Sequence, residues 1–202
     1  MNDRVATRST LLELRDERHS MREGYTFLDE KCLLLAGAML RELTRFEALW
    51  REYATLQVRA EDTLRAALGR HGLQGLALYP LDPASMGGLA LNIRKSSVMG
   101  VPLVDVVTDI RLPVVVDPLL RTPEADACAR AHADLLRVGT ELAAVSGNLE
   151  RLDHEYRRTS RRARALDGVL LPELEHDIDE MALNLEEQER EEAIMMRPRV
   201  AR

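Results

Sequence analysis

A long 3-4 spacing of apolar residues near the start of the chain, interrupted only by Arg18, Glu42 and Thr63, constrains the fold more than any other feature. Residues spaced in this way lie on one narrow face of an α-helix, which we call the seam. The spacing predicts a single helix of about 57 residues, roughly 85 Å long at the usual rise per residue. Its seam positions are Leu11, Leu14, Arg18, Met21, Tyr25, Leu28, Cys32, Leu35, Met39, Glu42, Phe46, Leu49, Tyr53, Leu56, Ala60, Thr63 and Ala67.

A second seam runs near the end of the chain. Around Leu166 its spacing changes to successive steps of four, which amounts to one extra residue and predicts a locally relaxed supercoil. The sequence therefore predicts a mainly α fold, a long antiparallel two-helix coiled coil formed by the N- and C-terminal segments. The positions of the second seam are Leu135, Val138, Leu142, Val145, Leu149, Leu152, Tyr156, Thr159, Ala163, Leu166, Leu170, Leu174, Ile178, Met181 and Leu185.

A proline, Pro172, interrupts the second predicted helix. Proline lacks the N–H that would bond to the carbonyl four residues back, and its ring crowds that carbonyl. The residue four back is Gly168, and a glycine leaves room for the crowding. We therefore expect Gly168 and Pro172 to mark a bend in a continuous helix.

Glycine and proline gather between the two helices, where six of the eight prolines lie. The stretch from Leu89 to Ile110 alternates apolar and polar residues on both sides of "MGVP", which predicts a β-hairpin in a small middle head. We expect a first shaft helix over 1–70, the head over 71–125, a second shaft helix over 126–196 and a short tail over 197–202.

The chain has 202 residues and a formal net charge of −6, which makes nucleic acid an unfavourable partner. Cys32 and Cys128 lie far apart and indicate reduced thiols in a cytosolic protein. The first twenty residues are charged throughout, so we expect no signal peptide, and "LLLAGAML" is too short to cross a membrane.

No catalytic or metal-binding pattern stands out in the sequence. A single Glu-x-x-His is formed by Glu173 and His176, but di-iron bundles need a second copy on another helix. No Gly-rich phosphate loop occurs. We expect no catalytic residue, no metal and no cofactor.

Five arginines gather within "RRTSRRAR" in this acidic chain. One interpretation is a solvated face whose charges pair along their own helix, as most surface charges do. The other is a surface that binds acidic groups of a partner. We call this group the arginine cluster; it consists of Arg157, Arg158, Arg161, Arg162 and Arg164.

Two charged residues, Arg18 and Glu42, occupy positions of the first seam. Polar residues in a seam cost stability but fix the register, so we expect both to hold the helices in one alignment. The expected alignment closes near Arg70 and Arg130. It places Glu42 opposite the arginine cluster, and it places Arg18 opposite the acidic residues Asp179, Glu180 and Glu186.

Three segments together resemble the D subunit of V-type and archaeal-type (V/A) ATPases and ATP synthases. "RRARALDGVLLPELE" resembles the family signature "RR-x-N-A-L-E-x-V-x-I-P". "ATRSTLLEL" with "GYTFLDEK" is similar to its N-terminal pattern, and "LEEQEREE" to its acidic C-terminal stretch. The chain departs from the pattern at Arg164, where the family has asparagine, at Asp167, where it has glutamate, and at Cys32, where it has a basic residue.

The resemblance implies a non-catalytic rotor shaft that couples ATP hydrolysis or synthesis to rotation and ion translocation. It implies that the joined termini enter the hexamer of catalytic A and B subunits. The head would lie near the F subunit and the socket subunit that links to the membrane ring, so the chain would be a cytoplasmic, peripheral part of a membrane-bound complex. The arginine cluster would face acidic groups of the hexamer. The alternative is a coiled-coil adaptor or secretion-stalk protein with no rotary role.

Overall fold

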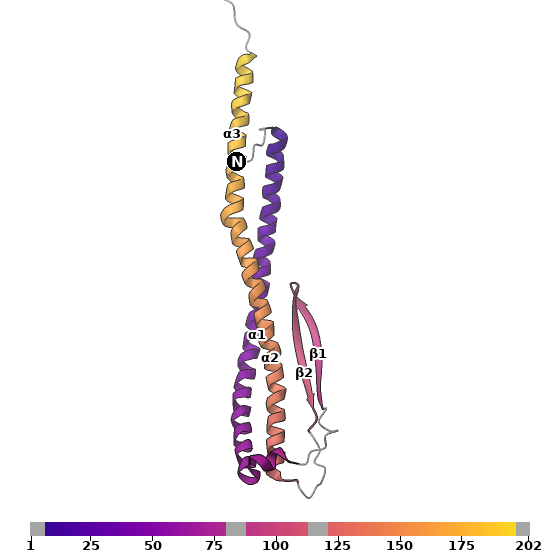
Figure 1. The fold of residues 1–202 in the computed structure, drawn as a ribbon. Coiled ribbons are helices and arrows are strands. Elements are labelled where there is room, and N and C mark those ends of the chain that lie inside the picture. The colour runs from indigo at the N-terminus through magenta and orange to yellow at the C-terminus, as the bar shows by residue number, and fades with distance from the viewer. Residues whose placement is uncertain (1–6, 80–87, 113–120, 197–202) are drawn as a thin grey trace, which may run out of the picture. The chain divides into compact units, whose positions relative to one another are not determined.

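The structure is a computed structural model that describes residues 7–79, 88–112 and 121–196. The predicted tail over 197–202 lies outside these residues, as do parts of the predicted head. The described elements are α1 (Arg8–Ala77), β1 (Leu89–Val98), β2 (Val101–Ile110), α2 (Pro123–Ala165), the π-helix η3 (Leu166–Leu170) and α3 (Leu171–Met195) (Figure 1). The predicted fold class, mainly α with a hairpin in the middle, is confirmed.

The chain divides into two compact units, one formed by the two ends of the sequence and the other by its continuous middle. Unit 1 comprises Met1–Leu34 and Tyr156–Arg202, and unit 2 comprises Leu35–Glu155. The division differs from the predicted division into helix, head and helix. The boundaries 1–70, 71–125 and 126–196 stay a prediction.

Helix α1 begins after Thr7, whose hydroxyl accepts a hydrogen bond from the backbone N–H of Thr10 at 3.1 Å and so caps the first turn. All seventeen predicted seam positions from Leu11 to Ala67 are buried or half-buried. The first seam is therefore confirmed. Near its end the helix is interrupted at Gly72, whose φ of 67° suits a residue without a Cβ.

The second seam is confirmed except at one position. Leu170 is 42% exposed, whereas Leu171 is only 8% exposed and takes its place. The reason is the π-helix η3, in which the backbone N–H of Leu171 bonds to the carbonyl of Leu166, five residues back. The predicted extra residue is therefore held in one wide turn, and the next buried residue follows Leu166 by five positions.

The predicted hairpin is confirmed, with Met99 and Gly100 as its two-residue turn. Both residues have positive φ, 49° and 84°, as the type I′ turn favoured by two-residue hairpins requires. In the register, Val98 pairs with Val101 and Lys95 with Val104. Strand β2 lies nearer to α2 than β1 does (Figure 1).

Each unit has its own buried core. In unit 1, Leu14 of α1 packs with Leu174, Ile178 and Met181 of α3. In unit 2 the buried side chains combine leucines with many smaller residues; they include Leu35, Leu142, Leu152, Ala38, Ala60, Ala67, Ala131, Val138 and Val145. Small seam residues let two helices approach closely: a Cβ added to Gly139 of α2 would lie 3.3 Å from the ring of Tyr53 of α1.

No helix in the described part of the chain combines the length and the apolar character that a membrane span needs.

Candidate interaction surfaces

The side chain of Asn148 fastens the hairpin to α2. Its carboxamide oxygen accepts a hydrogen bond from the backbone N–H of Val104 at 2.8 Å, and its NH₂ group donates to the carbonyl of Val104 at 3.0 Å. These two bonds are the ones that a neighbouring strand would make to Val104. Asn148 is 1% exposed. Its buried amide therefore makes the two hydrogen bonds to Val104 that a third strand would otherwise make.

The remaining capacity of the Asn148 amide is also used. Its second N–H donates to Glu42 of α1 at 3.2 Å, and Arg151 donates to its oxygen at 2.7 Å. Two donors and two acceptor bonds satisfy the amide completely. The side chain therefore joins α1, α2 and β2 at a single point.

Three further polar contacts hold β2 in place. Arg151 donates through Nε to the carbonyl of Pro102 at 2.9 Å, and Thr108 hydrogen-bonds to Thr140. Arg45 pairs with Asp105, and this hydrogen bond raises the pKa of the Arg45 guanidinium. The apolar contribution comes from Val101 and Leu103 near the turn, which are 5% and 9% exposed.

The register of the helices in unit 2 differs from the predicted one. Arg70 pairs with Glu124 at 3.2 Å, whereas the prediction closed the helices near Arg130. Helix α2 already begins at Pro123, which is earlier than the predicted closure near Arg130. Each residue of α1 in unit 2 therefore lies opposite an earlier residue of α2 than predicted. Glu42 consequently contacts Asn148. Its predicted pairing with the arginine cluster, which belongs to unit 1, stays a prediction.

Arg18, the other charged residue of the first seam, is half-buried in unit 1. Its expected partners Asp179, Glu180 and Glu186 belong to the same unit. Two ion pairs join α1 and α3 among the described residues there: Arg22 pairs with Glu175, and Arg8 pairs with Glu189. The register role of Arg18 stays a prediction.

The arginine cluster occupies the last turns of α2 in unit 1, and all five side chains are exposed. Arg161 donates through Nε to the carbonyl of Arg157 at 3.3 Å, which is a contact within its own helix. The exposed positions leave room for acidic groups of another protein. The role of the cluster as a partner contact stays a prediction.

Two of the departures from the family pattern lie close together. Burial and, after it, the charge of Asp29 raise the pKa of the Cys32 thiol, while the charges of Lys31 and Arg164 lower it. Arg164 is on α2 and Cys32 on α1, both in unit 1. The chain therefore carries a positive charge on the second helix near the place where the family pattern has one on the first.

A bend at Gly168 and Pro172 also stays a prediction, but its steric reason needs correction. A Cβ added to Gly168 would meet no other heavy atom within 4 Å, apart from its own helix backbone. Gly168 is thus not needed to make room for the proline ring. It lies in η3, where the wide turn already separates the two residues.

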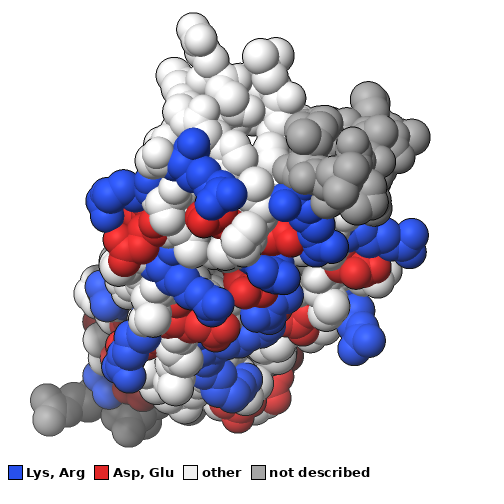
Figure 2. Space-filling model, turned by 90° about the horizontal axis from the view of Figure 1, so that it is seen from below, with Lys and Arg blue, Asp and Glu red and all other residues white. Residues whose placement is uncertain are grey.

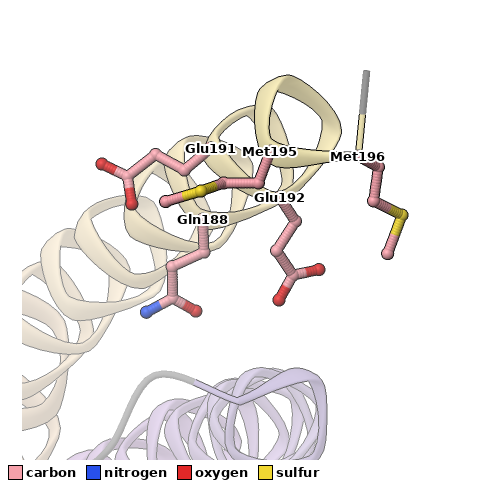
Figure 3. Close-up of a pocket in the computed structure, with 5 residues that line it drawn as sticks. All are labelled: Gln188, Glu191, Glu192, Met195 and Met196. Atoms are coloured by element: carbon pink, nitrogen blue, oxygen red, sulfur yellow. The ribbon is translucent and has the colours of Figure 1, made fainter. Parts of the chain in front are cut away.

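The C-terminal end of α3 exposes a group of apolar side chains that sequence reasoning missed. Ile194, Met195 and Met196 are 71%, 88% and 80% exposed. Figure 3 shows Met195 lying over Gln188 beside Glu191 and Glu192, around a shallow hollow of about 300 Å³. Because the last turns of α3 and the residue after it supply the described lining, the hollow suits contact with a protein surface better than binding of a small molecule.

Charges of both signs are mixed over the face of the molecule that is seen from below (Figure 2). Lysine and arginine side chains there lie beside aspartate and glutamate and do not form a continuous positive surface. Within the described residues, no three His, Cys, Asp or Glu side chains form a group that could hold a metal ion.

Sequence reasoning missed Asn148, whose side chain makes four hydrogen bonds within unit 2. Its partners on β2 are backbone atoms, which no side-chain pattern reveals. One signal was available, since asparagine is a poor residue for a helix interior and "SGNLE" places it there. The nearby Gly147 strengthens that signal.

Comparison with known proteins agrees with the resemblance seen in the sequence. The profile of the family described as the D subunit of ATP synthase matches residues 10–197. The D subunit of the V-type ATP synthase of Anaeromyxobacter dehalogenans is 32% identical, over 98% of this chain and 95% of that protein. The D subunit of the A-type ATP synthase of Methanopyrus kandleri is 26% identical, over 98% and 85%, and that of Thermococcus sibiricus 28%, over 92% and 87%. The chain belongs to the family of ATP synthase D subunits.

Proposed function

We propose that this chain is the central rotor shaft of a V/A-type rotary ATPase or ATP synthase. It couples ATP hydrolysis or synthesis in the hexamer of A and B subunits to rotation of the membrane ring and to ion translocation. The chain itself is non-catalytic and binds no nucleotide. It works on the cytoplasmic side, as a peripheral part of the membrane-bound complex.

The observation that carries the proposal is the burial of the first seam in α1. Its seventeen predicted positions are all buried or half-buried, from Leu11 to Ala67. Partners from α2 or α3 cover this seam in both units. A shaft that transmits torque must resist twisting along its length, and paired helices with continuous packing resist it better than loops do.

Unit 1 is the part of the chain that enters the hexamer in this proposal. It contains the described ends of α1 and α3, the arginine cluster and the exposed apolar residues Ile194, Met195 and Met196. Neighbouring exposed apolar side chains are a feature of surfaces that another protein covers. The arginines supply long, charged donors that can meet acidic groups of successive subunits during rotation.

Unit 2 then lies toward the membrane, where the F subunit and the socket subunit bind. The hairpin and the helix ends near Gly72 and Pro123 belong to this unit. Polar attachment of the hairpin through Asn148 leaves most of β1 exposed, because only the β2 side faces α2. This arrangement provides surface for partners without interrupting the paired helices.

Copurification tests the assignment. The tagged chain, coexpressed with the A and B subunits of its own organism, is expected to form a complex that hydrolyses ATP and rotates a bead fixed to the chain. A complex that hydrolyses ATP but leaves the bead stationary would contradict the shaft function. A chain that purifies only as a soluble oligomer would favour an adaptor.

The arginine cluster has its own test within that complex. Simultaneous charge reversal of Arg161, Arg162 and Arg164 to glutamate should leave the isolated chain helical but weaken its binding to the hexamer. The matched control reverses three exposed arginines of unit 2, which are Arg41, Arg59 and Arg130. Equal binding and turnover of both variants, at low and at moderate salt, would exclude a special role for the cluster.

A further inference from the structure

The two edges of the hairpin differ in what covers them. On the edge of β2, Asn148 bonds to both backbone groups of Val104, and Arg151 bonds to the carbonyl of Pro102. On the other edge, every residue of β1 from Ala90 to Ser97 is exposed. Within the described residues, β2 alone pairs with β1.

The register identifies the backbone groups of β1 that point away from β2. The N–H and C=O of Val104 point toward Asn148, so Val104 and its partner Lys95 form a pair without hydrogen bonds to each other. Such pairs alternate along an antiparallel ladder. The outward N–H and C=O groups of β1 therefore belong to Leu91, Ile93, Lys95 and Ser97.

The side chains beside this open edge combine apolar and positive groups. Leu91 and Ile93 are 48% and 55% exposed. Arg94 and Lys95 follow them, and "LALNIRKSSV" contains no acidic residue, although the chain as a whole has a net charge of −6. The nearest acid across the ladder, Asp105, is already paired with Arg45.

We propose that the open edge of β1 binds an extended acidic segment of another protein chain, which adds a third strand to the hairpin. The added strand pairs with the outward backbone groups from Leu91 to Ser97. It places apolar side chains beside Leu91 and Ile93, and acidic side chains beside Arg94 and Lys95. The proposal goes beyond the rotor function and does not depend on it.

A second copy of this chain fits the edge less well. Antiparallel pairing of two β1 strands centred on Arg94 would place the two Arg94 side chains opposite each other on one face and the two Lys95 side chains diagonally on the other. Positive charges in an edge strand oppose pairing with a second copy. The same charges favour an acidic strand.

Amide hydrogen exchange with single-residue resolution tests the proposal. The chain is measured alone and together with the protein chains that copurify with it from its own cells. In the isolated chain, the outward amides of Leu91, Ile93, Lys95 and Ser97 should exchange rapidly, whereas Asn92 and Arg94 exchange slowly. In the complex, the outward amides should slow by about tenfold or more, with no comparable change at Asn92 or Arg94.

Two results would overturn the proposal. One is rapid exchange of the four outward amides in the complex. The other is slow exchange of these amides in the isolated chain, with the rate falling further as the protein concentration rises. Such a result would show that a second copy binds the edge. Neither result depends on whether the copurifying chains are ATPase subunits.

A proline variant separates the backbone bonds from the charge. Lys95→Pro removes one outward donor but no bond to β2, and Pro102 shows that β2 already accepts proline at an outward position. Lys95→Gln removes the charge and keeps the donor. We expect the affinity for the copurified partner to fall in both variants and to fall further with proline. Equal affinities of Lys95→Pro and Lys95→Gln, with the hairpin intact, would contradict strand addition.

Discussion

The two units solve the same packing problem with different chemistry. In unit 1, Leu14 meets Leu174, Ile178 and Met181, and the ion pairs between α1 and α3 lie on the surface. In unit 2, the paired helices also carry a hairpin, and the polar residue Asn148 is 1% exposed. Polar groups enter the interior of unit 2 because β2 offers backbone atoms that only hydrogen-bonding partners can satisfy.

This difference shows which contacts a pair of helices must provide when a β-hairpin packs against them. Two helices alone bury apolar side chains and leave their own backbone bonded internally. A strand that lies against them brings unpaired N–H and C=O groups to the contact. Unit 2 meets this requirement with Asn148 and Arg151, which bond to backbone groups of Val104 and Pro102. The unit should therefore depend on these specific bonds in addition to its apolar burial.

Single-residue deletions in unit 1 should have the largest effect and separate η3 from the regular helix. Deletion of the exposed His176 turns Ile178, Met181 and Leu185 by about 100° away from α1 and should prevent cooperative folding of unit 1. Deletion of Val169, which is 50% exposed in η3, should convert the π turn into α-helix and cost at most about 1–2 kcal/mol. Thermal unfolding followed by circular dichroism measures the stability of both variants. Equal losses of stability would show that η3 does not accommodate the extra residue of the seam.

A cavity in the apolar unit comes next. Leu14 is 1% exposed and lies in the cluster with Leu174 and Ile178, so Leu14→Ala should destabilise the chain by about 2–5 kcal/mol. The matched control is Leu12→Ala, because Leu12 is 59% exposed. Urea denaturation of the two variants measures the difference. Similar unfolding midpoints would show that the cluster around Leu14 is not a main source of stability in unit 1.

Removal of the buried amide tests unit 2. Asn148→Ala leaves the N–H of Val104 without its partner and should cost about 1–3 kcal/mol, with faster hydrogen exchange at Val104. Asn148→Asp brings a carboxylate against Glu42, and Glu42→Gln should restore part of the loss by donating to it. Failure of the second change to help, or unaltered exchange at Val104, would argue that Asn148 does not attach the hairpin.

Two glycines should respond oppositely to alanine. A Cβ at Gly168 meets no other heavy atom within 4 Å, so Gly168→Ala should stabilise unit 1 by about 0.5–1 kcal/mol through reduced backbone freedom. A Cβ at Gly88 would lie 2.5 Å from that of Arg111, so Gly88→Ala should loosen the base of the hairpin. Differential scanning calorimetry can record both shifts, and a destabilised Gly168→Ala would restore the steric role expected from the sequence.

The smallest effect concerns a thiol of unit 1. The charge of Arg164 lowers the pKa of Cys32, against the larger raising effect of burial. Arg164→Gln should therefore raise that pKa further and leave less thiolate at any pH below it. In a Cys128→Ser background, alkylation of Cys32 by iodoacetamide should become slower, most clearly between pH 7 and pH 8, roughly one unit below an ordinary thiol pKa. An unchanged alkylation rate would show that the charge of Arg164 does not affect Cys32.

The seams and the hairpin could be predicted because their patterns are local. The 3-4 spacing needs only the helix period, and "MGVP" between two alternating stretches needs only turn chemistry. The exchange of Leu170 for Leu171 could not be predicted in the same way. The spacing showed that one residue was extra, but the turn that absorbs it depends on which leucine packs best.

The contacts of unit 2 were harder to predict for a different reason. Glu42 was recognised as a charge in the seam, yet its partner Asn148 is defined by β2, which joins the helices from elsewhere in the chain. A register estimate based on loop closure near Arg130 could not include that third element. The arginine cluster, by contrast, was visible in the sequence, and its exposed position in unit 1 leaves its partner to experiment.

The π turn gives the second helix a feature that a regular α-helix lacks, namely one additional residue within a single turn. Moving the turn by one position changes the orientation of a single residue while the helix on either side keeps its phase. Four of the five residues of η3, namely Asp167, Gly168, Val169 and Leu170, are exposed, so the packing of these four does not oppose such a step. Pro172 has no N–H to exchange between carbonyls and acts as a stop on the other side. A step of the turn within η3 would therefore leave the phase of α3, and with it the cluster around Leu174, unchanged.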